Sequence, residues 1–282
     1  MNAPAPATLH PDGSVEWSPR DGAPDLLFLL FHGVGATPRD LAPLGARLAG
    51  EYPQAAVLSV PAPDAFDAVP GGGAGRQWFS IVGVTEADRP ARVAAALPRF
   101  VGTVRALQRR FDMPWPRTAL VGFSQGAIMA LEAVQAVPQL AGRVVAFSGR
   151  YASPPAHAPE DVCVHLLHGL ADPVIPPGPV IDAGERLVAL GADVTADLRP
   201  GIGHELNPEL VELAIERLRG FLPKKLWRQA LADAPIESRV ASSRELGRDR
   251  RADGHDEARD EGHDGGHGND QDARRSDGDA AR

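Results

Sequence analysis

Short apolar runs alternate with segments of helical period along most of the chain, and this alternation restricts the fold more than any other feature. Runs rich in Val, Leu, Ile and Phe predict buried strands, and they lie at Leu26–His32, Ala55–Val60, Thr118–Phe123, Arg143–Phe147 and Val162–His168, with a weaker run at Val194–Leu198. Helical periods lie between them, at Pro38–Gly50, Arg89–Arg110, Gln125–Ala136, Pro179–Leu190 and Pro208–Phe221. Strands that alternate with helices favour parallel pairing. The sequence therefore predicts an α/β protein whose mostly parallel sheet carries helices on both faces.

The two ends of the chain differ from this pattern. Residues 14–18, SVEWS, predict an antiparallel edge strand that the turn PRDGAP joins to the first apolar run. Residues 1–13 are expected to be flexible, residues 14–235 to form one domain, and residues 236–282 to be disordered. Residues 241–282 hold eight arginines and twelve acidic residues with few large apolar side chains, a composition that does not support a core. Three tail histidines, His255, His263 and His267, stand among these acids, but without fixed geometry they define no metal site.

Charge and cysteine content limit the classes of partner. A formal net charge of -8 argues against binding to nucleic acid or to an anionic membrane, since both require a dense basic surface. The longest apolar run, LLFLLF, is too short to span a bilayer, and the first residues lack the pattern of a signal peptide. Cys163 is the only cysteine, which suits a reducing compartment. We expect a cytoplasmic protein with a small neutral or mildly polar substrate and no obligatory protein partner.

One serine stands where the third apolar run meets the following helical segment. The sequence GFSQG, residues 122–126, matches the GxSxG pattern of a nucleophile elbow. Glycines on both sides allow a tight strand-to-helix turn in which a Cβ would clash, and the helix N-terminus then points at Ser124 Oγ. The alternative is a serine that only caps the helix. The position between strand and helix favours Ser124 as a nucleophile.

A serine nucleophile needs a base and a carboxylate that orients the base, and in this architecture they follow the serine in the order Asp or Glu, then His. Asp172 lies in HGLADPVIP directly after the fifth run, whereas Asp161 precedes that run. His204 lies in RPGIGHELNP after the weaker sixth run, ahead of the last helix. Each residue taken alone also fits a turn or a surface position. Together, at three strand ends, they predict a Ser124, Asp172 and His204 triad.

Acyl transfer also needs hydrogen-bond donors for the oxyanion. The backbone N–H of Gln125, directly after the serine, is one expected donor. The second is expected from FHGVGATP after the first run, where the N–H of Val34 is favoured. An ordinary tight turn is the alternative for this loop. His32 is expected to support the loop rather than to act as a base.

Two further stretches are candidates for substrate contacts. GGGAGRQWFS, residues 71–80, combines glycines with Trp78 and Phe79 and is expected to form an acyl-binding wall or a flap; both aromatic residues also fit a core position. No Lys-Ser or Lys-Thr follows these glycines, so they are not a phosphate loop. Arg150, in FSGRYAS after the fourth run, fits either a polar part of the substrate or a structural ion pair.

Taken together, FHGVG, GRQWFS, GFSQGAIMALE, FSGRYAS, HGLADPVIP and the Gly-His pair at residues 203 and 204 resemble the phospholipase/carboxylesterase group of α/β-hydrolases, which also contains the acyl-protein thioesterases. The resemblance covers about residues 14–235 and implies the α/β-hydrolase fold. It also implies Ser124, Asp172 and His204 as the triad, and Val34 and Gln125 as the oxyanion donors. It implies nothing about the tail.

The sequence thus predicts a serine carboxylesterase that works through an acyl-enzyme on Ser124, on a small-molecule ester and without a metal or organic cofactor. A thioesterase of the acyl-protein thioesterase or lysophospholipase type would use the same triad. A non-catalytic protein that binds a partner in the cleft or through its tail is the third hypothesis. Acyl length and leaving group depend on pocket dimensions, which the sequence does not give.

Overall fold

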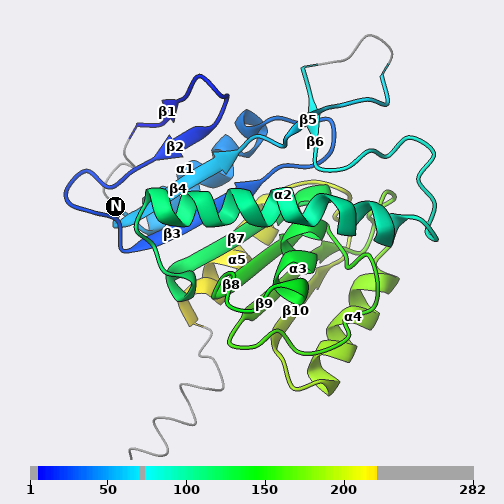
Figure 1. Cartoon of the computed structure of the whole chain (residues 1–282). Helices are drawn as coiled ribbons and strands as arrows, with labels where there is room; N and C mark the ends of the chain where they lie inside the picture. Colours follow the sequence, from blue (N-terminus) through cyan, green and yellow to red (C-terminus); the bar gives the residue numbers. More distant parts are fainter. Residues whose placement is uncertain (1–5, 70–73, 221–282) are drawn as a thin grey trace, which may run out of the picture. The chain divides into compact units, whose positions relative to one another are not determined.

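A computed structural model describes residues 6–69 and 74–220, and its main sheet has eight strands (Figure 1). Their spatial order is β1-β2-β4-β3-β7-β8-β9-β10, and all neighbours from β4 to β10 pair in parallel. The bounds are Thr8–Leu9 for β1, Val15–Trp17 for β2, Leu26–Phe31 for β3, Ala55–Val60 for β4, Thr118–Phe123 for β7, Arg143–Phe147 for β8, Cys163–Gly169 for β9 and Asp193–Arg199 for β10. The predicted α/β class and mostly parallel sheet are confirmed.

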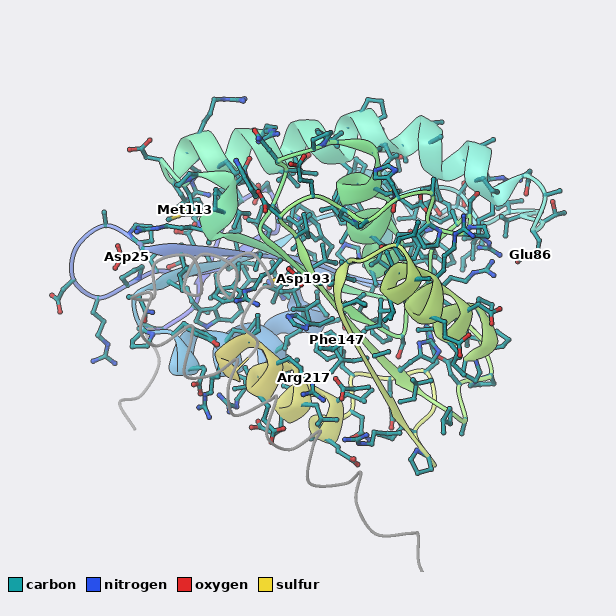
Figure 2. The ribbon with its side chains drawn as sticks, turned by 90° about the horizontal axis from the view of Figure 1, so that it is seen from below. Asp25, Glu86, Met113, Phe147, Asp193 and Arg217 are labelled. Atoms are coloured by element: carbon teal, nitrogen blue, oxygen red, sulfur yellow. The ribbon has the colours of Figure 1, made fainter. Side chains whose placement is uncertain are left out.

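Helices cover both faces of this sheet. They are α1, Ala42–Glu51, α2, Arg89–Arg110, α3, Gln125–Ala136, α4, Gly178–Ala189, and α5, Pro208–Gly220, with 3₁₀ turns at Pro38–Leu41 and Trp115–Arg117. The buried side chains of α2, α3 and α4 pack on one face, and those of α1 and α5 on the other. Figure 2 shows α2 and α5, the latter marked by Arg217, on opposite sides of the sheet. In residues 6–69 and 74–220, no helix is long and apolar enough to cross a membrane.

Strand β3 shows why the central runs are continuously apolar. Leu27, Leu29 and Phe31 point into the core under α2, α3 and α4. Phe28 and Leu30 point into the core under α1 and α5. Side chains alternate between the two faces of a strand, so a sheet covered on both faces buries every position.

The N-terminal edge of the sheet differs from the prediction. Strand β2 pairs antiparallel with β4, not with β3, and β1 covers its outer side, so β2 is not the edge strand. Thr8 and Leu9, within the segment expected to be flexible, pair with Glu16 and Val15. A two-residue strand is too short to give a periodic signal, which is why the sequence did not reveal it. The tail predicted at residues 236–282 lies outside the described residues.

A second sheet, which the sequence did not predict, lies next to the loop after β3. Strands β5, Asp64–Ala65, and β6, Arg76–Gln77, pair antiparallel at the base of a long loop (Figure 1). Backbone hydrogen bonds connect Arg76 to the loop after β3: Gly35 N–H donates to the Arg76 carbonyl at 2.8 Å, and Arg76 N–H donates to the Ala36 carbonyl at 2.9 Å. This small sheet therefore fixes the residues that follow it, Trp78 and Phe79. The glycines at 71–73 lie outside the described residues.

Candidate active site

The turn between β7 and α3 presents Ser124 in a strained backbone conformation. Its φ of 52° and ψ of -115° lie in a region that residues with a Cβ rarely adopt. A Cβ built at Gly122 would lie 2.4 Å from Ala127 N, and one at Gly126 would lie 2.0 Å from the Phe31 carbonyl oxygen. Only glycine fits at either position. The two glycines of GFSQG thus allow the close approach of strand and helix that gives this turn its shape.

The three residues predicted as a triad come together at the carboxyl edge of the sheet. His204 Nε2 lies 2.9 Å from Ser124 Oγ, and His204 Nδ1 lies 2.7 Å from Asp172 Oδ2. Ser124 and Asp172 are buried, with 7% and 5% of their surfaces exposed. The ring of Phe123 packs beside the imidazole of His204, with 5.1 Å between centroids. Both distances suit the transfer of a proton from the hydroxyl to an oriented imidazole.

The loop after β9 holds Asp172 as a carboxylate. Its Oδ1 accepts hydrogen bonds from the backbone N–H groups of Val174, at 2.8 Å, and Ile175, at 2.9 Å. Burial alone would raise the pKa of Asp172, but the hydrogen bonds from His204 and these two N–H groups keep it below its ordinary value. The ionised form is therefore the stable one beside His204.

A second imidazole, His168, lies beneath this loop and was missed in the sequence. Its Nε2 donates to the Ile175 carbonyl at 2.8 Å and lies 3.4 Å from Asp172 Oδ2. Burial lowers the pKa of His168, so the ring is neutral. It is a positioning residue for the 172–175 turn. In the sequence, His168 stands out only because it lies four positions before Asp172. That spacing alone does not distinguish it from any other histidine in a buried strand.

The side chain of Gln125 fastens the aromatic segment that follows β6. Its Oε1 accepts from Trp78 N–H and its Nε2 donates to the Phe79 carbonyl, both at 2.8 Å. The indole N–H of Trp78 donates to the His32 carbonyl at 2.9 Å. His32 Nε2 in turn accepts from Ala62 N–H at 3.0 Å, and burial lowers the pKa of this imidazole. These contacts agree with the supporting role expected for His32.

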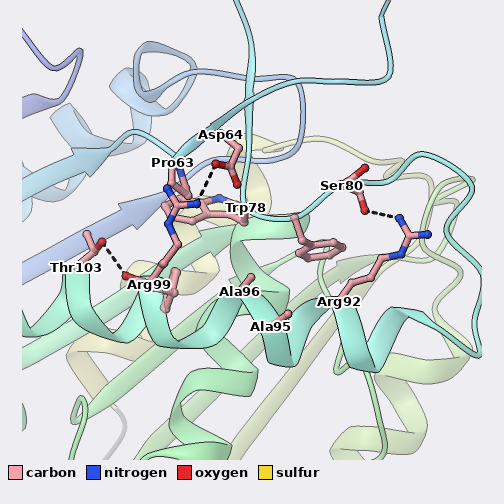
Figure 3. Close-up of a pocket in the computed structure, with 11 residues that line it drawn as sticks. Pro63, Asp64, Trp78, Ser80, Arg92, Ala95, Ala96, Arg99 and Thr103 are labelled. Carbon is pink, nitrogen blue, oxygen red and sulfur yellow. Dashed lines mark hydrogen bonds and ion pairs between the residues drawn. The ribbon is translucent and has the colours of Figure 1, made fainter.

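A cavity of about 250 Å³ opens beside Ser124. Of the predicted site residues, Val34, Phe79, Gln125 and Arg150 line it together with Ser124. Trp78 instead packs against Phe31 and Phe100 and lines a second cavity of about 340 Å³ under α2 (Figure 3). Phe79 lines both cavities.

Most of the remaining wall of the catalytic cavity could not be recognised in the sequence. It consists of apolar side chains from two loops and α3, together with a charged corner: Ile81, Val84, Ile128, Val174, Ile175, Pro176, Glu86 and Arg89. Ile128, Val174, Ile175 and Pro176 lie in motifs quoted above, but those motifs do not show that these side chains line a cavity, and the other four residues belong to no motif. Only the path of the backbone brings them to Ser124.

Within the described ranges, no three His, Cys, Asp or Glu side chains gather as metal ligands. The hydroxyl of Ser124, the imidazole of His204 and the carboxylate of Asp172 lie within hydrogen-bond distance of one another in a series at this edge of the sheet. A mostly parallel α/β sheet with such a serine elbow is the architecture of the α/β-hydrolases, and its Ser-His-Asp arrangement is that of serine hydrolases.

Comparison with known proteins identifies the family. The family model for phospholipases and carboxylesterases matches residues 16–222, and the chain belongs to this family of hydrolases. It is 45% identical to Esterase YpfH of Escherichia coli over 222 residues, which cover 78% of this chain and 93% of that protein. It is 32% identical to Acyl-protein thioesterase 1 of Gibberella zeae over 117 residues, 39% of this chain and half of the relative. The crystal structure of esterase PE8 superposes with a TM-score of 0.65 at 30% identity, covering 73% of this chain and 97% of that one. The protein is therefore an esterase of the phospholipase/carboxylesterase family.

Proposed function

We propose that the protein hydrolyses small carboxylic esters through an acyl-enzyme on Ser124. The observation that carries the proposal is the continuous hydrogen-bonded series from Ser124 Oγ through His204 to Asp172, with distances of 2.9 and 2.7 Å. His204 Nε2 accepts the proton of Ser124 as its oxygen attacks the ester carbonyl. Asp172 holds the tautomer that leaves Nε2 free to accept it. His204 then protonates the departing alcohol. In the second half of the reaction, water gives a proton to His204 as it attacks the acyl-enzyme carbonyl, and the acid leaves as Ser124 Oγ regains the proton.

The oxyanion of each tetrahedral intermediate would receive hydrogen bonds from the backbone N–H groups of Gln125 and Val34. Both residues line the same cavity as Ser124. A donor of this kind typically contributes about 10²- to 10³-fold to kcat. The loop of Val34 is fastened to Arg76, so its N–H is held before the substrate arrives.

The cavity favours short acyl groups. Its volume of about 250 Å³ lies below the roughly 300–1,000 Å³ of pockets that enclose drug-sized ligands. Its largely apolar wall suits an aliphatic chain of a few carbons. We expect kcat/KM to be highest for short p-nitrophenyl esters and to fall as the acyl chain becomes longer.

Thioester hydrolysis is the second candidate, because the chain is similar to an acyl-protein thioesterase over 117 residues. The triad would be the same, and only the leaving group would differ. Rates on matched oxygen and sulfur esters distinguish the two activities.

We also propose a cytoplasmic location, on the ground that the sequence contains one cysteine, Cys163, which is buried.

The test is labelling of the purified protein with a fluorophosphonate, alongside Ser124→Ala. Labelling of the wild type that disappears in the variant supports the serine nucleophile. Absence of labelling in a folded wild type would contradict it and favour a protein that binds a partner without catalysis. The p-nitrophenyl ester series then tests the expected preference for short acyl groups.

A further inference from the structure

The catalytic cavity has one charged corner in an otherwise apolar wall. Glu86, Arg89 and Arg150 contribute this corner, and Ser124 lines the same cavity. Among its described lining residues there are two guanidinium groups and one carboxylate. The corner therefore carries a net positive charge, although the protein as a whole is at -8.

Glu86 binds both arginines through the two oxygens of its carboxylate. Its Oε1 accepts from Arg89 Nη2 at 2.9 Å, and its Oε2 accepts from Arg150 Nη2 at 2.5 Å. The two arginines are largely buried, with 18% and 14% of their side chains exposed, whereas 70% of the Glu86 side chain is exposed. Because Glu86 is mostly exposed, its carboxylate can move into solvent while another carboxylate takes its place, so the two arginines are not left without a counter-charge.

The arginines themselves are held in place. Arg89 is the first residue of α2, and the turn just before it is closed by Thr85 Oγ1 and N–H, which both donate to Asp88 Oδ1. Arg150 follows Gly149, where an added Cβ would lie 2.3 Å from Ala127 Cβ and 3.3 Å from the Ser124 carbonyl. Arg150 is thereby kept beside the nucleophile. In Figure 2 Glu86 lies at the margin of the molecule, near the N-terminal end of α2.

One buried donor at this corner is unsatisfied. Among the described residues, Nε of Arg89 is buried and has no hydrogen-bond partner. A buried donor without a partner is costly, and a guanidinium presents several donors that suit a planar anion. Glu86 uses only one nitrogen of Arg89, so the site can bind more oxygen atoms than its own carboxylate provides.

From this arrangement we infer that the preferred esters carry a second, anionic group, a carboxylate or a phosphate, which binds Arg89 and Arg150 in place of Glu86 while the reacting carbonyl lies at Ser124. This inference rests on the proposed ester hydrolysis. Glu86 and Arg150 also line an adjoining cavity of about 490 Å³ that contains Ser153, Asp182 and Arg186. A substrate can therefore extend past the arginines without filling the smaller cavity.

The first test compares mono-p-nitrophenyl glutarate, which has an anionic acyl group, with neutral p-nitrophenyl butyrate. A second pair, 3-acetoxybenzoate and 3-acetoxybenzamide, places the charge on the leaving group. The ratio of kcat/KM for the anionic and the neutral ester of each pair is the quantity measured. The pair with the larger ratio identifies the side of the ester that carries the charge, and phosphate as a competitive inhibitor tests the other anion.

In Arg150→Ala the ratio should fall about 10- to 100-fold through KM for the anionic ester, as expected when a charged hydrogen bond is lost. Arg150→Lys should restore part of it. Glu86→Gln should raise the ratio, because the competing carboxylate is removed and the size of the side chain is kept. Arg99→Ala, which removes an exposed arginine paired with Asp64, is the matched control and should leave the ratio unchanged.

Equal ratios in wild type, Arg150→Ala and Glu86→Gln would overturn the inference while leaving ester hydrolysis intact. Failure of the wild type to hydrolyse either neutral ester would instead refute the proposed function. A rise of the ratio in Glu86→Gln together with a fall in Arg150→Ala would support an anion site, because a merely structural ion pair would change both variants in the same direction.

Discussion

The buried side chain of Gln125 should contribute strongly to stability, because it makes two hydrogen bonds to the segment that follows β6. In Gln125→Ala, Trp78 N–H and the Phe79 carbonyl lose partners at 2.8 Å, and both residues are at least 95% buried. Each unsatisfied buried group costs about 1–3 kcal/mol. This cost is partly offset, because alanine avoids the roughly 1–2 kcal/mol of side-chain conformational entropy that glutamine loses on folding. The expected net loss is about 3 kcal/mol of the free energy of unfolding.

Urea unfolding measures this loss as a lower midpoint with an unchanged slope. Gln125→Met is the control, because it keeps the length of the side chain and removes both hydrogen bonds. Most of the loss should persist in it. Since neither substitution removes the backbone N–H of residue 125, kcat should fall far less than in Ser124→Ala. A loss below about 1 kcal/mol in both variants would show that Gln125 does not hold the aromatic segment in solution.

Three further substitutions test the site and the fold. Asp172→Asn should lower kcat on a short p-nitrophenyl ester by about 10³- to 10⁴-fold, because the amide favours the wrong tautomer of His204; a fall below tenfold would contradict the orienting role. Gly126→Ala places a Cβ 2.0 Å from the Phe31 carbonyl and should lower the urea midpoint by the equivalent of about 2–3 kcal/mol or more, so wild-type stability would contradict the close approach. Burial, assisted by nearby arginines, lowers the pKa of His165 from 6.5 to about 4. The unfolded chain therefore takes up a proton first as the pH falls below about 6.5, and stability should drop by about 2 kcal/mol between pH 7 and pH 5. His165→Gln should lose this part of the pH dependence of the urea midpoint, and an identical dependence in both proteins would refute the assignment.

The positions of strands and helices could be predicted where the pattern of apolar residues fits only one of the two. Strand Thr118–Phe123 and helix Gln125–Ala136 have the predicted bounds, because an apolar run meets a glycine-flanked serine and a helical period. Strand β1 was missed because two residues carry no period. Helix α1 begins later than the predicted Pro38, since the first four residues of that segment form a 3₁₀ turn.

Some residues of the candidate site could likewise be predicted from the sequence, and others could not. Residues that follow strands in order, such as Asp172 and His204, could be located because parallel strands bring their carboxyl ends to one edge. The contacts of His168, Glu86 and Arg89 depend on which loops lie beside one another in the fold. No local sequence pattern shows that arrangement. Trp78 illustrates the limit for aromatic residues: the sequence allowed either a core or a wall position, and only the hydrogen bond to the His32 carbonyl and its packing decide.

The left-handed backbone of Ser124 sets stability and activity against each other at a single residue. A residue with a Cβ at such a φ costs the fold about 1–3 kcal/mol. Ser124→Ala keeps that cost and removes the hydroxyl, whereas Ser124→Gly removes both. Selection of variants of this esterase for thermal stability alone should therefore enrich Ser124→Gly. The resulting protein would be more stable but would have no nucleophile. A thermostability screen on this scaffold needs an activity filter at every round.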